Sequence, residues 1–200
     1  MISLKQIVYQ LLNKYNGTLS MKDAKAAGIS ATTITRMVNN GELEREYPGY
    51  FTLPGHFSDE LLIAQKQYQR GIISHVSALD LYDLTDNIPK KIDLTVPRGY
   101  NVPKDRLANF AIELHFTKSE WYELGKTTYN SRFGNEIVIY DRERTLCDIW
   151  NPWTQLDAEV RYKALQRYMV SDERNIRKLN EYRSIFPTLS ELRAAVIALN

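Results

Sequence analysis

The stretch from residue 20 to residue 53, SMKDAKAAGISATTITRMVNNGELEREYPGYFTL, constrains the fold most, because it stops and restarts regular structure within a few residues. Helical patterns end at the glycines of AAG and NNG, where a positive φ suits a helix terminus. Ser20 and Ser30 stand where helix-capping side chains are expected. The spacing therefore predicts two short helices, at about residues 20–27 and 31–40, joined by a tight glycine turn, which is a helix-turn-helix.

The segments on either side complete a winged version of this motif. Before it, LKQIVYQLLNKY carries apolar residues at helical spacing behind Ser3, and Gln6 is placed for a capping box. After it, residues 43–53 are β-prone and turn at Pro48-Gly49, which predicts a hairpin, the wing. We therefore expect a winged helix-turn-helix domain at residues 1–57.

The helix at residues 31–40 is the expected DNA-reading element. Its apolar residues Ile34, Met37 and Val38 lie on one side and its polar residues on the other. In this fold that helix enters the major groove, where Asn pairs with adenine and Arg with guanine. The wing is placed to touch the DNA backbone or the minor groove. The predicted DNA-binding residues are Thr32, Thr33, Thr35, Arg36, Asn39 and Asn40 of the helix, with Arg45 and Tyr47 of the wing.

This helix alone gives little base discrimination. It carries one arginine and two asparagines, and a good bidentate base contact contributes about 1–3 kcal/mol. We therefore expect the protein to bind double-stranded DNA as a pair of copies on two half-sites. The alternative is that the module only mediates protein contacts and that the polar face of its third helix is simply solvated.

Residues 58–200 are expected to form a second domain. Helical spacing at about residues 59–70 and in GIISHVSALDLYDL precedes alternating strands in KKIDLTVPRG and FAIELHF, followed by a hairpin around Gly134-Asn135. The remainder reads as helices, in blocks of about 142–150, 155–169, 172–184 and 188–199. Strands followed by helices predict an α+β domain with a small, mostly antiparallel sheet and a helical tail.

Composition indicates the cellular compartment of the protein more than its function. The chain has 200 residues and a net charge of +2, so a nucleic-acid surface must arise from three-dimensional sorting of charge. The sequence has no apolar run of about 18 or more residues, so a membrane span is not expected. A single cysteine, Cys147, fits a reducing compartment, and we expect a cytoplasmic protein.

The residue patterns do not predict an enzyme. The histidines at positions 56, 75 and 115 have no metal-ligand spacing, and no phosphate-binding GxxxxGK loop occurs, so neither a metal nor a cofactor is expected. Ser74 and His75 are neighbours whose side chains should point apart on a helix or strand, which excludes a nucleophile–base pair. His75 is instead interpreted as a structural residue at a helix start.

Other reactive-looking residues have plainer interpretations. Cys147 lies among apolar residues and is predicted to be in the core. The acidic residues Asp141, Glu143 and Asp148 alternate with Arg142 and Arg144, which indicates salt-bridged helix capping rather than a catalytic carboxylate cluster. The tryptophans are interpreted as core or interface anchors rather than base-stacking platforms; they are Trp121, Trp150 and Trp153.

Two motifs of the second domain, SHVSALDLYDLTDNIPKKIDLTVPRG and IYDRERTLCDI, resemble the AbiEi antitoxin family of bacterial abortive-infection toxin–antitoxin systems. The order of winged helix, α+β domain and helical tail resembles that family too, so the likeness spans nearly the whole chain. The resemblance implies a type IV antitoxin. Its N-terminal domain would repress its own operon at promoter inverted repeats, and its C-terminal domain would antagonise the nucleotidyltransferase-like toxin AbiEii without an obvious stable complex. The alternative is a stand-alone transcriptional regulator whose C-terminal domain senses a ligand or partner.

Basic residues of the second domain are the candidates for the antitoxin surface. Arg98 follows a strand end within the motif TVPRG, and Arg144 lies within the motif ERTLCD. The alternative is that most of these residues are solvated charges among interleaved acids. The candidates are Lys90, Lys91, Arg98, Arg144, Arg167, Arg174, Arg177 and Lys178.

Overall fold

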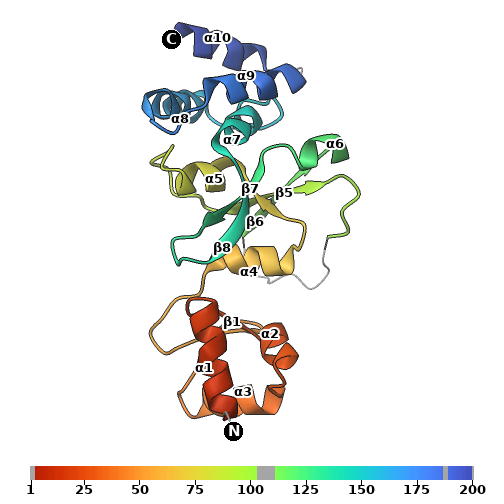
Figure 1. The fold of residues 1–200 in the computed structure, drawn as a ribbon, viewed down its shortest axis with the longest axis vertical. Coiled ribbons are helices and arrows are strands. Elements are labelled where there is room, and N and C mark those ends of the chain that lie inside the picture. Colours follow the sequence, from red (N-terminus) through yellow and green to blue (C-terminus); the bar gives the residue numbers. More distant parts are fainter. Residues whose placement is uncertain (1–2, 103–110, 187–188, 200) are drawn as a thin grey trace.

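The computed structural model describes residues 3–102, 111–186 and 189–199. The molecule is elongated, with the N-terminus at one end and the C-terminus at the other (Figure 1). A small N-terminal domain lies below the sheet of the second domain in this view, and a group of helices lies above that sheet. The apolar side chains form two main clusters, one from Ile7 to Leu53 and a larger one from Leu61 to Val196, and a small third one around Ile72, Tyr122 and Tyr140.

The N-terminal domain is a winged helix-turn-helix. Its elements are α1 (Leu4–Lys14), β1 (Leu19–Ser20), α2 (Met21–Ala26), α3 (Ala31–Asn39), β2 (Glu44–Tyr47) and β3 (Tyr50–Thr52). The predicted caps form: Ser3 and Gln6 make a capping box, and the Ser20 and Ser30 hydroxyls accept from Asp23 N and Thr33 N. The wing has one strand more than predicted, because β1 pairs antiparallel with β3.

The second domain is built on a five-stranded sheet of order β6-β5-β4-β8-β7. Its strands are β4 (Ile72–Ile73), β5 (Ile92–Pro97), β6 (Ile112–Thr117), β7 (Lys126–Asn130) and β8 (Glu136–Tyr140). The predicted hairpin forms as β7 and β8, in register from Lys126 opposite Tyr140 to Asn130 opposite Glu136. The sequence did not predict β4, which has only two residues and lies in the middle of the sheet.

The α+β class, the winged helix and the helical tail are confirmed, but the sheet is mixed rather than mostly antiparallel. Two of its pairings are antiparallel, β4 with β5 and β7 with β8, and two are parallel, β4 with β8 and β5 with β6. The two predicted strands β5 and β6 are joined by a connection long enough to bring the chain back in the same direction. Strand direction follows from such a connection and not from the alternation of side chains within a strand.

Helices pack against the sheet, and further helices form the C-terminal tail. They are α4 (Glu60–Gln67), α5 (His75–Leu81), α6 (Ser119–Tyr122), α7 (Arg142–Ile149), α8 (Ala158–Val170), α9 (Ile176–Ile185) and α10 (Ser190–Ala198). Helix α7 contacts α5, α8 and α9, so it links the sheet layer to the tail. Cys147 and Trp150 are buried there as predicted, whereas Trp153 is 85% exposed and is not a core anchor. Residues 187 and 188, at the predicted start of the last helix, lie outside the described residues.

Candidate nucleic-acid interface

Helix α3 presents a polar face to solvent. Its apolar side chains Ile34 and Met37 are buried in the N-terminal core. The opposite face is exposed, and it carries Thr32, Thr35, Arg36 and Asn39, with Asn40 at the C-terminal cap. This arrangement follows from the 3.6-residue period of the helix, because residues three and four apart share a face.

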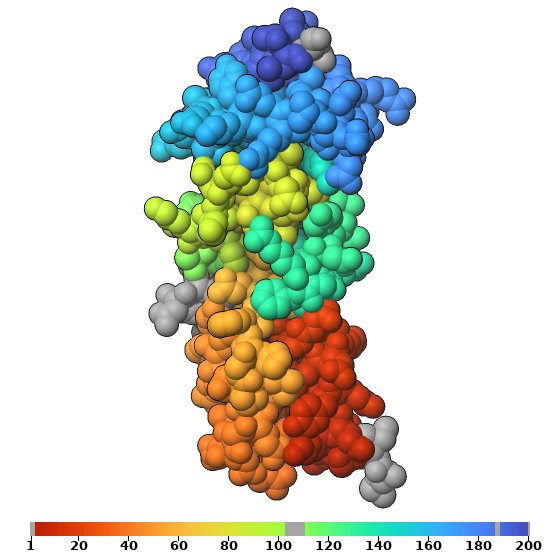
Figure 2. All heavy atoms as spheres, turned by 90° about the vertical axis from the view of Figure 1, so that its left-hand side faces the viewer, coloured from red at the N-terminus to blue at the C-terminus, as the bar shows by residue number. Residues whose placement is uncertain are grey.

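The polar face of α3 is accessible in the whole molecule. Helix α3 lies at the end of the N-terminal domain that is farthest from the second domain (Figure 1). In the space-filling view the N-terminal domain forms one end of the molecule, and the second domain and tail extend the other way (Figure 2). The second domain therefore does not cover this face, and a duplex can approach it from outside.

Two of the predicted helix residues have local structural roles. Thr33 is only half-exposed, and its hydroxyl lies 3.0 Å from that of Ser30, which also accepts from Thr33 N at 3.1 Å. Thr33 therefore belongs to the start of the helix rather than to the centre of its exposed face. Asn40 ends the helix, and its backbone N–H donates to Arg36 O.

The two wing residues differ from each other. Arg45 is exposed, and its guanidinium lies 5.5 Å from the ring centre of the buried Phe51, which fixes the side chain on the wing surface. The Tyr47 hydroxyl donates to Glu60 Oε1 at 2.5 Å, so it points to α4 of the second domain. Burial and this carboxylate raise the pKa of Tyr47. Tyr47 thus has a partner at the domain junction.

Lys22 and Lys25 of α2 are two cations beside α3 that the sequence pattern did not single out. Both are exposed, and among the residues that the structure describes no ion pair involves either one. In a helix-turn-helix the first helix of the motif crosses the phosphate backbone. Both lysines stand at polar positions of a predicted helix, which is the pattern that could have identified them. The sequence alone does not show that both side chains are exposed and unpaired with acids.

The structure places Arg144 inside the second domain, so it is not part of an exposed antitoxin surface. Its side chain is 1% exposed. The guanidinium donates to Asp148 Oδ1 at 2.9 Å and to the carbonyls of Trp121 and Leu124 at 2.5 and 2.9 Å. It also packs on the ring of Tyr140, 4.2 Å from the centroid. A residue inside a family motif can thus have a structural role in the core. The sequence alone does not distinguish that role from binding.

The other predicted cations are on the surface, and most are paired with acids. Lys91 pairs with Glu113, Arg167 with Asp86, Arg177 with Glu181, and Lys178 with Asp141, at 2.7, 2.5, 3.7 and 2.8 Å. Arg174 donates to the carbonyl of Ser171. These contacts distribute the tail cations over several acidic partners. Lys90 and Arg98 are exposed, and no ion pair involves them within the described part of the chain.

Ser74 and His75 do not point apart, contrary to the prediction. Ser74 Oγ lies 2.9 Å from His75 Nδ1, because His75 adopts a left-handed φ of 49° that neither a helix nor a strand would have. The serine is fully buried, and its oxygen also accepts from Thr95 Oγ1 at 2.8 Å. The pair is therefore enclosed, with no exposed nucleophile. His75 is a structural residue at the start of α5, as interpreted.

Among the residues that the structure describes, no group of three or more His, Cys, Asp and Glu side chains is arranged to hold a metal ion. No helix in the described ranges is both long and apolar enough to cross a membrane.

Comparisons with known proteins agree with this geometry. Residues 6–54 match a family described as transcriptional regulator, AbiEi antitoxin. A search of curated proteins found no match. The crystal structure of the RV2827C protein from Mycobacterium tuberculosis superimposes with a TM-score of 0.62 at 17% identity, covering 98% of this chain and 75% of that one, which shows a shared fold. The match supports the predicted resemblance: over residues 6–54 the chain is similar to the AbiEi antitoxin transcriptional regulators.

Proposed function

We propose that this protein is an antitoxin that represses its own operon and opposes a nucleotidyltransferase-like AbiEii toxin in a type IV abortive-infection system. The observation that supports the DNA-binding part is the exposed polar face of α3 at the free end of the molecule. The toxin part rests on the family of the N-terminal domain and on the motifs of the second domain. We place the boundary between the two functional parts at residues 57–58.

The proposed mode of DNA binding uses both helices of the motif. Helix α3 enters the major groove with Arg36 and Asn39 at base edges, while Lys22 and Lys25 of α2 contact phosphates. Because one copy reads few bases, two copies bind inverted half-sites whose centres are one helical turn, roughly 34–36 Å, or a multiple of that, apart. Phosphate neutralisation makes this affinity fall steeply as salt rises.

The test is the affinity of full-length variants for the DNA upstream of the operon, measured by fluorescence anisotropy. Arg36→Ala and Asn39→Ala should each weaken binding by about 1–3 kcal/mol, or roughly 5- to 150-fold, because each removes a base contact and no core packing. Arg177→Ala is the matched control, since that arginine is also exposed but lies on α9. Equal affinity of Arg36→Ala and Arg177→Ala would contradict the assignment of α3.

The antitoxin part is tested with the same full-length variants. Co-expression of the toxin with Arg36→Ala should leave cell growth protected, provided expression of both proteins is driven from a foreign promoter. The reason is that the proposed toxin-opposing surface lies in the second domain, away from α3. Loss of protection in this folded variant would argue that DNA binding and toxin control are not separate activities.

The alternative function, a stand-alone regulator with a ligand-sensing second domain, is favoured by one observation. A pocket of about 670 Å³ lies beside the sheet of that domain, within the range of roughly 300–1,000 Å³ typical of ligand sites. An upstream DNA affinity that changes when a small molecule occupies this pocket would support it.

A further inference from the structure

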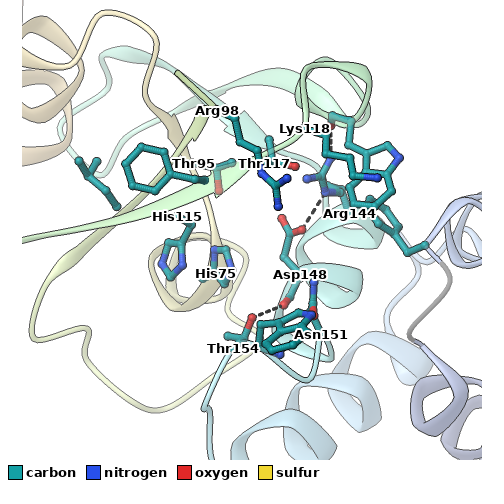
Figure 3. Close-up of a pocket in the computed structure, with 15 residues that line it drawn as sticks. His75, Thr95, Arg98, His115, Thr117, Lys118, Arg144, Asp148, Asn151 and Thr154 are labelled. Carbon is teal, nitrogen blue, oxygen red and sulfur yellow. Dashed lines mark hydrogen bonds and ion pairs between the residues drawn. The ribbon is translucent and has the colours of Figure 1, made fainter. Parts of the chain in front are cut away.

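The pocket lies where two parallel strands end. Arg98 directly follows β5, and Thr117 and Lys118 stand at the end of β6 (Figure 3). Helix α7 supplies Arg144 and Asp148 from the other side, and the segment after it supplies Asn151 and Thr154. The crevice at the carboxyl ends of parallel strands is where ligands bind in open α/β sheets.

Asp148 carries an unused hydrogen-bond acceptor at this pocket. The residue is 9% exposed, and its Oδ1 accepts from Arg144 Nε at 2.9 Å. Its Oδ2 is buried and has no hydrogen-bond partner among the described residues. In Figure 3 the free side of this carboxylate faces Arg98 across the pocket. A buried acceptor without a donor is costly, so a ligand that brings an N–H or O–H group here gains a pre-formed partner.

The charge of the pocket favours an anion. The ion pair of Arg144 with Asp148 leaves no net charge, and Arg144 is locked by two backbone carbonyls. Arg98 and Lys118 remain as exposed cations. Within the described ranges, their only ion pair is a surface contact of 3.6 Å from Lys118 to Glu120. Such an exposed pair contributes little, so both cations are available to a phosphate group.

Exposed aromatic rings border the same cavity. Trp153 is 85% exposed and Phe116 is 52% exposed, and both line the pocket. The segment that carries Trp153 is fixed, because Thr154 Oγ1 donates to the Asp148 carbonyl at 2.8 Å and Trp153 N donates to Asn151 Oδ1 at 3.2 Å. Aromatic side chains held beside cations are the usual platform on which nucleobases stack.

Two stacked histidines close the side of the pocket away from α7. The rings of His75 and His115 are nearly parallel, with centroids 3.5 Å apart. His115 Nε2 lies 2.8 Å from Asp93 Oδ1, and the Ser74 hydroxyl fixes His75. Both rings line the cavity and keep it polar without adding a free anion.

We propose that this pocket binds a nucleotide unit, either a free nucleotide or the end of an RNA strand. Arg98 and Lys118 bind its phosphate, Asp148 Oδ2 accepts from an N–H of the base or a sugar hydroxyl, and Trp153 or Phe116 stacks on the base. The inference concerns the second domain and stands apart from DNA binding by α3, so either proposal can fail without the other.

The experiment is isothermal titration of the full-length protein, without DNA, with the four ribonucleoside triphosphates and monophosphates. Inorganic phosphate, the unphosphorylated nucleosides and free α-amino acids are titrated beside them. At least one nucleotide should bind with a Kd below about 1 mM, and tighter than inorganic phosphate or its own nucleoside by at least about tenfold, because both ends of the ligand are recognised.

Three variants assign the contacts. Arg98→Gln should weaken nucleotide binding at least about tenfold but leave the affinity for the nucleoside unchanged, since it removes a phosphate contact only. Asp148→Asn should weaken the binding of nucleotide and nucleoside alike, because an amide N–H donor takes the place of the acceptor Oδ2. Arg177→Gln, an exposed arginine outside the pocket, should stay within about twofold. If Asp148→Asn fails to fold, Arg98→Gln still decides, because Arg98 is on the surface.

The source of the nucleotide is decided with a fluorescent single-stranded RNA trinucleotide. Displacement of this RNA by the mononucleotide, together with weaker RNA binding in Arg98→Gln, identifies an RNA end; binding of the mononucleotide alone identifies a free nucleotide. Several results would overturn the proposal: no nucleotide or RNA binding, phosphate binding as tight as nucleotide binding, binding of an amino acid alone, or affinities unaffected by both Arg98→Gln and Asp148→Asn.

Discussion

At the residue scale, His75 shows how one backbone angle shapes the second domain. Its left-handed φ of 49° is unusual for a residue other than glycine and carries strain. The angle turns the imidazole onto His115 and within 2.9 Å of Ser74 Oγ. Burial first, and then the charges of His115 and Arg144, hold the pKa of His75 well below the ordinary value of 6.5.

This shift predicts how stability depends on pH. Unfolded His75 takes up a proton as the pH falls through about 6.5, while folded His75 stays neutral, so the unfolded state binds more protons. The stability contribution is therefore complete above pH 6.5 and is lost as the pH falls below it, at up to about 1.4 kcal/mol per pH unit. Urea unfolding of the wild type between pH 7 and pH 5 should show this loss.

The variant His75→Asn is expected to flatten that dependence, because asparagine tolerates a left-handed φ and does not titrate. His56→Asn is the matched control, since it makes the same substitution at an exposed histidine. A wild-type slope in His75→Asn would mean that another group carries the pH dependence.

At the element scale, the turn between α6 and β7 depends on Gly125. Its φ is +78°, and a Cβ added there would lie 2.5 Å from Arg144 Cβ. Arg144 cannot retreat, because its guanidinium is bound to Trp121 O and Leu124 O. The turn, the buried arginine and helix α7 are thus fixed together by one close approach.

Gly125→Ala should therefore destabilise the protein more than Gly99→Ala. Gly99 has a φ of +80° but nothing within 4 Å of its added Cβ, so its substitution costs only the left-handed conformation, about 1–2 kcal/mol. The contact at Gly125 should add about 1–3 kcal/mol of overpacking. The free energies of unfolding of the two variants are measured by denaturant titration. An equal loss of stability in both would show that Arg144 moves to make room for the added Cβ.

At the scale of the whole molecule, Asp59 joins the two domains. It caps α4 by accepting from Leu61 N and Leu62 N. Its Oδ2 accepts from Ser131 Oγ at 2.5 Å and Asn135 Nδ2 at 2.9 Å, and its backbone N–H donates to Thr18 Oγ1 of the N-terminal domain at 2.8 Å. The residue is 1% exposed, so these bonds are shielded from water.

We expect the wild type to unfold in one calorimetric transition, because the buried bond from Asp59 N to Thr18 Oγ1 couples the domains. Asp59→Ala should cost about 2–4 kcal/mol, as it removes a helix cap and leaves buried donors without an acceptor. Thr18→Val, which removes the acceptor of the Asp59 N–H across the junction, should separate the transition into two. Tyr47→Phe, which removes the hydroxyl that donates to Glu60, should keep one transition. A single unshifted transition in Thr18→Val would exclude this coupling.

How much the sequence could predict depended on the range of the interactions. The exposed face of α3 was predictable, because Ser30, Ile34 and Met37 follow rules that act within one helix. Strand β4 was not, because two residues become a strand only through partners on β5 and β8. The pocket was missed too, since its stacked histidines are 40 positions apart and no local pattern relates them.

The sequence by itself determined the winged helix, its caps and turns, and the polar face of its third helix, since periodicity and capping depend on neighbours along the chain. Only the tertiary structure decided the strand directions, the burial of Arg144, and the placing of Arg98 opposite Asp148. Each of these depends on which distant segments pack together, and hydrophobic burial is not directional enough to encode that pairing in a local stretch of residues.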